Sequence, residues 1–349
     1  MSKQTHKADI VSVAKLAGVS PATVSRALNH PDLVNPATRK KIDAAIRKSG
    51  YIRNRAAQMM HGRRSATIGI IVPTVSYAIF AEVVQAFNET VSDQGFTLLL
   101  SSHGYDLGTE YVVLRKLLEH RIDGVALIGL DHSPDTIRLL QEQEVPMVAI
   151  WNYSDDFPFS CIGAENAEAG RCAAEHLAML GHRRIGQVFP PVSDNDRARA
   201  RLKAVRSVFD QNGVISEPRW SAETRYSLSE AKAACLRILS QEDRPTALLC
   251  GNDIIAHGAI YAAMKLGLSI PNDLSVVGIG DFAGSAEMEP ALTTVRLPAR
   301  KIGKAAGAHL VEAIARRDTN FIERIRFDVE LMMRKSSAPV YYPPTGPDR

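Results

Sequence analysis

The periodicity of apolar residues changes near residue 66 of this 349-residue chain. Before that point, apolar residues recur at intervals of three and four, which is typical of amphipathic helices. Beyond it, short unbroken apolar runs, which indicate buried strands, alternate with helical stretches. The strand-like runs are residues 68–72, 97–101, 124–128, 147–150, 185–189, 247–250 and 275–279.

Most of these runs are separated by stretches with helical spacing. The predicted helices are residues 80–94, 110–119, 135–143, 168–180, 197–212, 228–239 and 254–266. Unbroken apolar strands between amphipathic helices predict parallel sheets that are covered on both faces. Two such units in tandem predict two doubly wound subdomains, the architecture of periplasmic binding proteins, in which ligands bind in a cleft at the carboxyl ends of the strands.

Two short helices joined by a tight turn are predicted within residues 12–29. Ser12 is the expected N-cap of the first helix, and Gly18 supplies the left-handed backbone of the turn. Ser20 is expected to cap the second helix, with Pro21 at its first position, where the missing N–H costs nothing. On that helix Val24, Ala27 and Leu28 face inward, and the outward residues are Pro21, Ala22, Ser25, Arg26 and Asn29.

This outward face suits the major groove of DNA. Small residues allow close approach, hydroxyls bond phosphate, and Arg26 can form a forked contact with a guanine edge. Pro21 and Ala22 leave Arg26 as the main polar base contact. The candidate DNA contacts of this helix are Ser20, Pro21, Ala22, Thr23, Ser25, Arg26 and Asn29. Asn35 is expected to cap a third helix, residues 36–49, which ends at Gly50; the alternative is a small helical domain with an ordinary solvated face.

The charges are divided unevenly along the chain. Residues 1–64 contain 13 Lys and Arg against 3 Asp and Glu, a formal charge of +10. The remaining residues contain 29 against 35, a formal charge of −6, which together with the head gives the total of +4. A strongly basic head on a mildly acidic body indicates that only the head has a polyanionic partner.

Residues 13–29, VAKLAGVSPATVSRALN, resemble the opening signature of the lactose/galactose-repressor family of bacterial transcription factors almost residue for residue. Ser12 stands where that family usually has Asp. The resemblance implies a transcriptional repressor that binds operator DNA as a homodimer or higher oligomer and is switched by a small-molecule effector. It also implies the two-subdomain fold, with chain crossings near residues 161–166, 294–298 and 321–327.

The resulting domain plan has five parts. They are a helix-turn-helix domain (1–51), a hinge or linker (52–66), an N-terminal effector subdomain (67–163 plus about 296–322), a C-terminal effector subdomain (164–295 plus about 323–340) and a tail (341–349).

Within the linker, residues 52–66, Arg55 to Met60 could form about a turn and a half of helix, which alone is unstable in water. In the resembled family this segment is a hinge helix that folds in the minor groove when two copies meet. The resemblance places Met60 as the apolar wedge, Ala57 against the groove floor, and Asn54 as a cap or backbone contact. Arg53 and Gln58 depart from the family pattern, and a flexible basic linker is the alternative.

The loops at the strand ends contain candidate effector contacts. Aromatic side chains can stack on a sugar ring, while Asn, Asp and Arg bond hydroxyls or carboxylates. Their location in loops after predicted strands, together with the family resemblance, gives the candidate effector contacts. They are Tyr77, Phe80, Trp151, Asn152, Asn195, Arg197, Arg201, Tyr226, Asn252 and Asp281. The same loops also contain His103, Tyr105, Asp106, Asp194, Asp196 and Asp253. Arg201 matches the family's near-constant ligand arginine, and Gly280 stands where many members have a ligand Asp, for which Asp281 is the neighbouring candidate.

Two further stretches narrow the effector class. Residues 102–106 with Glu110, and residues 288–296, resemble the gluconate-repressor branch of the family. Arginines in the cleft suit a sugar acid. The sequence therefore favours a sugar or sugar acid such as gluconate, and it leaves open whether the ligand releases DNA or promotes its binding.

Other classes of protein find little support. Gly278, Gly280 and Gly284 superficially resemble a dinucleotide loop, but the last spacing is one residue too long. The histidines show no metal-ligand or nucleophile motif, so no metal, no cofactor and no enzyme activity are expected. The four cysteines lack paired spacing, which indicates reduced thiols.

No apolar run approaches ~20 residues and residues 1–9 are polar, which predicts a cytoplasmic, nucleoid-associated protein without a membrane partner. The alternatives are a sugar-binding transport protein, which the basic head and the missing signal peptide disfavour, and a cytosolic sugar-metabolising enzyme, which no motif supports.

Overall fold

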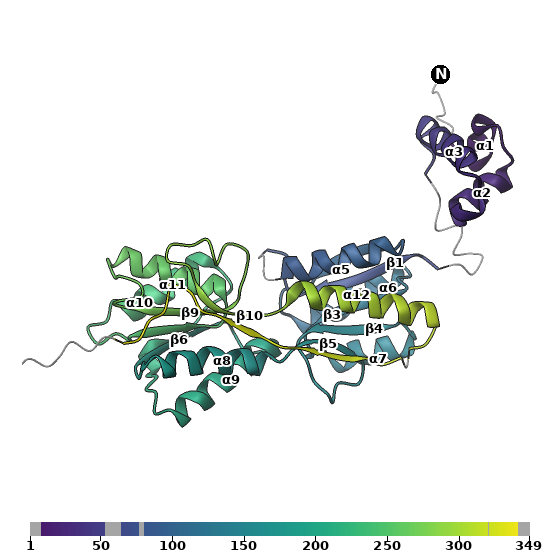
Figure 1. The fold of residues 1–349 in the computed structure, drawn as a ribbon. Coiled ribbons are helices and arrows are strands. Elements are labelled where there is room, and N and C mark those ends of the chain that lie inside the picture. The colour runs from purple at the N-terminus through teal and green to yellow at the C-terminus, as the bar shows by residue number, and fades with distance from the viewer. Residues whose placement is uncertain (1–7, 53–63, 77–79, 320, 341–349) are drawn as a thin grey trace, which may run out of the picture. The chain divides into compact units, whose positions relative to one another are not determined.

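The computed structural model describes residues 8–52, 64–76, 80–319 and 321–340. The chain divides into two compact units, Met1–Ser65 and Ala66–Arg349. Figure 1 shows the helical first unit and the mixed helix-and-strand second unit. Within the described ranges, no helix is long and apolar enough to cross a bilayer.

The described residues of the first unit, 8–52 and 64–65, contain three α-helices around a small core. They are α1 (Ile10–Ala17), α2 (Pro21–Asn29) and α3 (Pro36–Ser49), with a 3-10 turn, Pro31–Leu33, after α2. The core residues are Val13, Ala14, Val24, Ala27, Ile42 and Ala45. Leu28 and Val19 are half-buried against this core. The inward face predicted for the second helix is therefore confirmed.

The prediction that Ser12 caps the first helix is wrong. Asp9 is the N-cap: its carboxylate accepts a hydrogen bond from the Ser12 backbone N–H at 2.8 Å. The Ser12 hydroxyl accepts in return from the Asp9 backbone N–H at 3.0 Å, so the two residues form a capping box. A hydroxyl at the third helical position can thus look like a cap when the true cap lies three residues earlier.

The other helix signals of this unit are confirmed. Gly18 and Gly50 both adopt left-handed backbone, with φ of +67° and +65°. The Ser20 side chain accepts from the Thr23 backbone N–H, and the Asn35 side chain accepts from that of Ala37. These caps satisfy backbone donors that a helix start otherwise leaves without a partner.

The second unit contains two six-stranded sheets, and the first is entirely parallel. Its strands are β1 (Thr67–Val72), β2 (Thr97–Ser102), β3 (Gly124–Ile128), β4 (Met147–Trp151), β5 (Ser160–Ala164) and β11 (Arg324–Phe327), in the order β11-β5-β4-β3-β1-β2. Its helices are α5 (Ala81–Asp93), α6 (Leu107–Glu119), α7 (Pro134–Glu142) and α12 (Ala299–Arg316).

Alternating side chains of the first sheet serve two separate cores. Ile70 and Val148 point toward α5 and α12, whereas Ile71 and Ala149 point toward α6 and α7. Figure 1 shows α5 and α12 side by side on one face. Gly303 makes this approach possible, because a Cβ there would lie 2.3 Å from the Val83 carbonyl oxygen.

The second sheet is parallel except for its last strand. Its strands are β6 (Ile185–Phe189), β7 (Ser221–Glu223), β8 (Ala247–Cys250), β9 (Ser275–Gly280), β10 (Thr293–Arg296) and β12 (Glu330–Met332), in the order β12-β10-β9-β8-β6-β7. Its α-helices are α8 (Asn166–Met179), α9 (Asp196–Gln211), α10 (Leu228–Leu239) and α11 (Asp253–Lys265), and a 3-10 turn, Pro218–Trp220, precedes β7. Helices cover both faces, so the predicted α/β fold class is confirmed.

The chain passes three times between the two sheets. The first two passages connect β5 to α8 and β10 to α12, at the predicted places. The third lies between β11 and β12, because β11 pairs with β5 in the first sheet. The assignment of residues 324–327 to the second subdomain is therefore wrong. All four cysteines are free thiols, and Cys161, Cys235 and Cys250 are buried.

Candidate DNA-binding surface and effector cleft

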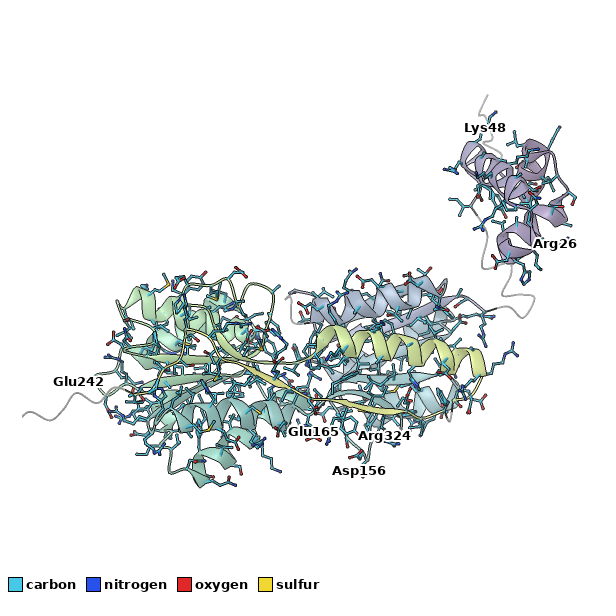
Figure 2. The ribbon with its side chains drawn as sticks, in the orientation of Figure 1. Arg26, Lys48, Asp156, Glu165, Glu242 and Arg324 are labelled. Carbon is cyan, nitrogen blue, oxygen red and sulfur yellow. The ribbon has the colours of Figure 1, made fainter. Side chains whose placement is uncertain are left out.

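The exposed face of α2 presents one long cationic side chain. Pro21, Ala22 and Arg26 are exposed, and Figure 2 shows Arg26 on the surface of the helical unit, as it does Lys48 on α3. A small-residue surface beside an extended guanidinium fits the geometry of groove reading. The predicted contacts Asn54, Ala57 and Met60 lie outside the described residues.

The remaining polar groups of α2 bond within the helix. The Asn29 amide donates to the Ser25 carbonyl at 2.7 Å and to the Ser25 hydroxyl at 3.2 Å. The Thr23 and Ser20 hydroxyls share a hydrogen bond of 2.8 Å. These hydrogen bonds occupy part of the bonding capacity of the four side chains, and hydroxyl and amide groups of this kind commonly contact phosphate oxygens.

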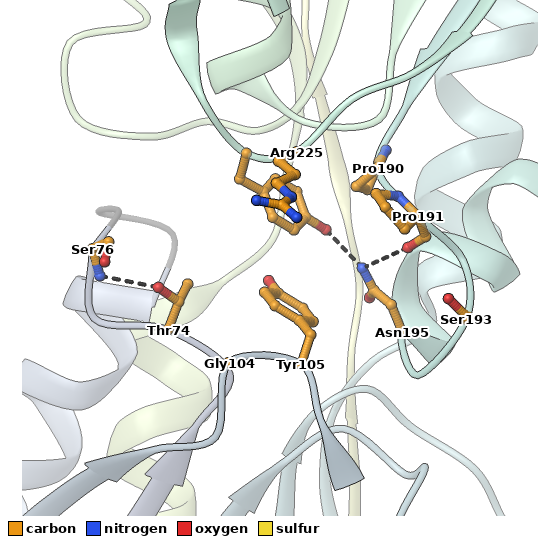
Figure 3. Close-up of a pocket in the computed structure, with 10 residues that line it drawn as sticks. Thr74, Ser76, Gly104, Tyr105, Pro190, Pro191, Ser193, Asn195 and Arg225 are labelled. Carbon is orange, nitrogen blue, oxygen red and sulfur yellow. Dashed lines mark hydrogen bonds between the residues drawn. The ribbon is translucent and has the colours of Figure 1, made fainter. Parts of the chain in front are cut away.

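A cleft of about 440 Å³ lies at the carboxyl ends of the strands in the second unit. The first subdomain lines it from the loops after β1 and β2, and the second from the loops after β6 and β7. Its lining residues are Thr74, Ser76, Gly104, Tyr105, Pro190, Pro191, Ser193, Asn195, Arg225 and Tyr226. Figure 3 shows Tyr105 opposite Arg225 and Pro190, with Thr74 and Ser76 to one side.

Two tyrosines meet across the cleft. The rings of Tyr105 and Tyr226 lie 5.6 Å apart with an interplanar angle of 31°. The Asn195 amide donates to the Tyr226 hydroxyl at 3.0 Å and so fixes the orientation of that ring. Burial raises the pKa of Tyr105 well above its ordinary value, and the nearby Tyr226 adds to the effect, so the phenol stays neutral.

A buried ion pair with further hydrogen bonds lies at the start of α9. The buried Asp196 Oδ2 accepts from the Leu130 backbone N–H and from the Asn152 amide, both at 2.8 Å. Its Oδ1 accepts from the Arg197 guanidinium at 2.7 Å, and Arg197 also donates to the Ile128 carbonyl at 3.3 Å. Burial acts to raise the pKa of Asp196, but the Arg197 charge and these hydrogen bonds outweigh it and leave the pKa below its ordinary value.

Arg201, one helical turn further along α9, has different partners. Its side chain donates to the Asn166 side-chain oxygen at 2.8 Å and to the Gly251 carbonyl at 2.9 Å, and it is only 5% exposed. Both partners are neutral, and no carboxylate among the described residues accepts a hydrogen bond from it. Burial lowers the pKa of Arg201 to about 10, which leaves it charged at neutral pH.

Two buried polar atoms in this region lack a partner within the described part of the chain. They are the Asn252 amide nitrogen, on the residue after Gly251, and the His103 Nδ1, in the loop that carries Tyr105. Buried polar groups are nearly always hydrogen-bonded, so each marks a position where a bound molecule or a water can donate or accept.

The predicted effector residues fall into three groups. Asn195 and Tyr226 line the open cleft. A second group, Phe80, Trp151, Asn152, Arg197, Arg201 and Asn252, is buried behind it. Phe80 and Trp151 pack edge to face at 5.3 Å. Tyr77 lies outside the described residues.

Asp281, the remaining predicted effector residue, has two arginine partners. Its carboxylate accepts from Arg296 Nε at 2.7 Å and pairs with Arg334 at 2.6 Å, and it is not part of the cleft lining.

Several cleft residues were not selected from the sequence. Tyr105 and Asp196 sit in loops that strand-end position had marked, but nothing in the sequence ranked them above their neighbours. Ser193 and Arg225 lie in the same kind of loop. Asn166 opens α8, and its role depends on Arg201 reaching it from another helix. Their position after the carboxyl ends of predicted strands could have identified these loops. Asn166 is identified only by the packing of α8 against α9.

A helix-turn-helix unit joined to a cleft between two parallel-sheet subdomains defines the class of DNA-binding regulators that respond to a small molecule. Residues 9–54 match the family described as bacterial regulatory proteins, lacI family, and residues 174–337 match the periplasmic binding protein-like domain. The HTH-type transcriptional repressor PurR of Aliivibrio salmonicida is 33% identical over 332 residues, which cover 94% of this chain and 98% of that protein. The chain therefore belongs to the lacI family and is a transcriptional regulator, not an enzyme.

Solved structures agree with this assignment. The lac repressor dimer bound to operator and the anti-inducer ONPF superposes with a TM-score of 0.79 at 27% identity, covering 95% of this chain and 99% of that one. The transcription regulator GntR of Chromobacterium violaceum gives a TM-score of 0.73 at 29% identity, covering 78% and 99%.

Proposed function

We propose that this chain is a repressor that binds a near-palindromic operator as a homodimer and is switched by a sugar acid such as gluconate in the cleft. The observation that carries the ligand class is Arg201, a buried charge that hydrogen-bonds only to neutral partners. A charge removed from water is compensated best by an opposite charge in good hydrogen-bond geometry. A ligand carboxylate at Arg201 supplies that partner.

The rest of the cleft suits the polyol part of such a ligand. The hydroxyls of Thr74, Ser76 and Ser193 and the amide of Asn195 line it. The unpartnered Asn252 amide follows Gly251, which Arg201 contacts, so it is a further donor to a ligand oxygen at the same end. Sites that orient polyols combine aromatic walls with a few such polar groups.

The similarity to a regulator named GntR favours a sugar acid, whereas the curated relatives are named PurR. A nucleobase is therefore the competing ligand class. A sugar acid requires that the Arg201 guanidinium, which already donates to Asn166 and Gly251, also donate to the ligand carboxylate. A flat nucleobase requires space between Tyr105 and Tyr226, whose ring centroids lie 5.6 Å apart.

The dimer is supported by apolar side chains that the second unit leaves exposed on each subdomain. On α11 Met264 is 60% exposed and Tyr261 lies one turn before it, and on the edge strand β2 Leu100 is 45% exposed. Contiguous apolar patches, rather than single exposed residues, commonly mark association surfaces, so these side chains are candidates for the edge of such a patch on each subdomain. A two-fold dimer matches a two-fold DNA site. The hinge, residues 52–66, is proposed to place Asn54, Ala57 and Met60 in the minor groove, and the protein to act in the cytoplasm.

The experiment that tests the ligand class compares gluconate with sorbitol, which has the same polyol chain but a neutral terminus, and with hypoxanthine. Thermal unfolding of the full-length protein is followed with each compound. Gluconate is expected to raise the melting temperature more than sorbitol does, because only gluconate carries the carboxylate. A rise in melting temperature with hypoxanthine alone would contradict the sugar-acid proposal and indicate a nucleobase effector.

A further inference from the structure

The two subdomains are joined across the cleft by a hydrogen-bonded carboxylate that belongs to the protein itself. Asp196 opens α9 in the second subdomain, yet two of its three side-chain donors, the Leu130 N–H and the Asn152 amide, belong to the first. The third donor is the neighbouring Arg197. The carboxylate therefore sits in a cage of three donors drawn from both subdomains.

The backbone of the first subdomain is shaped to admit this pair. Gly129 has φ of +97°, and a Cβ at that position would lie 2.0 Å from the Arg197 guanidinium and 2.9 Å from the Asp196 carboxylate. Only glycine leaves this space free, so the loop between β3 and α7 accommodates the start of α9. The Ile128 carbonyl completes the contact by accepting from Arg197 at 3.3 Å.

A second cross-cleft pair lies at the rim. Arg199 donates to the Asp131 carboxylate at 2.5 Å, with the two side chains 48% and 31% exposed. Exposed pairs of this kind contribute little, because solvent screens them. The buried Asp196 cage is therefore the dominant polar link between these two loops.

We propose that Asp196 is an internal stand-in for a carboxylate ligand, which holds the two subdomains together when no effector is bound. The Leu130 N–H, the Asn152 amide and the Arg197 guanidinium are the donors that an anionic ligand bridging the cleft would use. Because the Asp196 carboxylate already accepts hydrogen bonds from these donors, closure of the cleft does not require the effector. The inference rests on the proposed function only in naming the effector as a second, separate anion at Arg201.

This arrangement has a consequence for regulation. A ligand changes an equilibrium only through its different affinity for the two states. With Asp196 in place the subdomains are already joined in the ligand-free protein. The effector therefore changes the stability of a closed state that exists without it. Without Asp196, closure would depend on the effector's own contacts.

The test measures hydrogen exchange at the Leu130 amide in the full-length protein without DNA or effector. In Asp196→Ala this amide loses its acceptor, and exchange is expected to accelerate roughly tenfold or more, as the loss of a charge-assisted hydrogen bond implies. Arg199→Gln is the matched control at the rim, and its effect on Leu130 is expected to stay below about threefold.

Formate distinguishes a carboxylate-specific role from a merely structural one. The space left by Asp196→Ala can take formate, which restores the same acceptor oxygens, so millimolar formate is expected to slow Leu130 exchange again in the variant and to leave the wild type unchanged. Faster exchange that formate does not reverse would contradict the stand-in role, and unchanged exchange would contradict the link itself.

Asp196→Asn covers the case in which the alanine variant does not fold. It keeps the side-chain volume but turns an amide group toward Arg197, and Leu130 exchange is expected to lie between those of the wild type and the alanine variant. Wild-type exchange in Asp196→Asn would again contradict the proposal. None of these readings involves a sugar acid or an operator, so they can fail or succeed independently of the proposed function.

Discussion

In the N-terminal unit most of the described side chains that we propose to contact DNA follow one another on a single nine-residue helix, whereas the cleft takes its lining from loops as far apart as Thr74 and Tyr226. The first surface depends on local signals, namely a cap, a turn glycine and the helical period. The second exists only when two sheets are correctly formed and placed. A change in α2 should therefore alter DNA binding alone, and a change in the cleft should alter the ligand response alone.

Two of the four arginines of α9, Arg197 and Arg201, sharpen this contrast. Arg197 is paired with Asp196, while Arg201, one turn later, bonds to an amide and a carbonyl. We propose that the first arginine belongs to the closure of the cleft and that the second binds a ligand anion. Their substitution should have separable consequences.

The largest effect is expected from Arg201→Gln. Losing one partner of a buried charged pair costs about 2–5 kcal/mol, so gluconate affinity should fall roughly 30-fold to several thousandfold. Calorimetric titration measures this loss, and Arg199→Gln, at the exposed rim, is the control expected to keep near wild-type affinity. Normal gluconate binding by Arg201→Gln would remove this residue from the site.

Arg26→Ala should affect the other half of the molecule. Loss of a forked base contact costs about 1–3 kcal/mol, so specific operator affinity should fall roughly 5- to 150-fold, with a much smaller change on random DNA. Fluorescence anisotropy at one fixed salt concentration measures both affinities. Lys48→Ala, on α3, is the comparison for a general loss of charge, and an equal loss on both DNAs for Arg26→Ala would make Arg26 a phosphate contact instead.

Low pH should destabilise the second unit, Ala66–Arg349. Burial lowers the pKa of His182 to about 4 from an ordinary value near 6.5, and it also lowers the pKa of His103, His176, His257 and His309. Between pH 6.5 and 4 the unfolded chain therefore binds more protons than the folded one. The free energy of unfolding of the second unit should be greatest above about pH 6.5 and should decrease as the pH falls toward 4.

Tryptophan fluorescence follows this decline selectively, because both tryptophans, Trp151 and Trp220, lie in the second unit. His182→Gln should make the stability of that unit less dependent on pH between 6.5 and 4. An identical pH dependence in the variant would assign the acid sensitivity to other groups.

The smallest effect is expected from Ser20→Ala. Removing an N-cap costs about 1 kcal/mol, which should lower the stability of the helical unit while ligand affinity stays unchanged. Circular dichroism of a melt resolves the change if the units unfold separately. Ser12→Ala provides an informative comparison, because Ser12 is the reciprocal member of the Asp9 capping box rather than a cap. A greater loss from Ser12→Ala than from Asp9→Ala would contradict that assignment.

The local signals of the sequence were sufficient for most of the head, with the Ser12 cap as the exception. They also identified the strands with unbroken apolar runs, but not β5 and β10, which lie inside the sheets. The structure has the predicted helix caps at Ser20 and Asn35 and the predicted turn glycine at Gly18. Such caps and turns depend on adjacent residues and can therefore be read from the sequence. Short edge strands were harder to predict. β7 has only three residues, and β11 alternates exposed and half-buried positions, so neither carries the unbroken apolar run that marked the interior strands.

The cleft could be predicted as a region but not as a set of contacts. Strand-end position placed Asn195 and Tyr226 correctly on its wall. It could not show that Asp281 faces Arg296 and Arg334, because both partners come from later strands or loops of the chain. Nor could it separate Arg197 from Arg201, since the difference lies in which side chains from other helices and loops reach each one.

The most direct test of the central claim measures operator affinity with and without ligand on one protein. Full-length wild type is titrated onto a palindromic fragment from its own upstream region, in buffer alone, with gluconate, and with sorbitol at equal ionic strength. The account predicts that gluconate changes operator affinity, that sorbitol does not, and that Arg201→Gln binds the operator normally but no longer responds to gluconate. An operator affinity that is indifferent to gluconate but changes with hypoxanthine would contradict it.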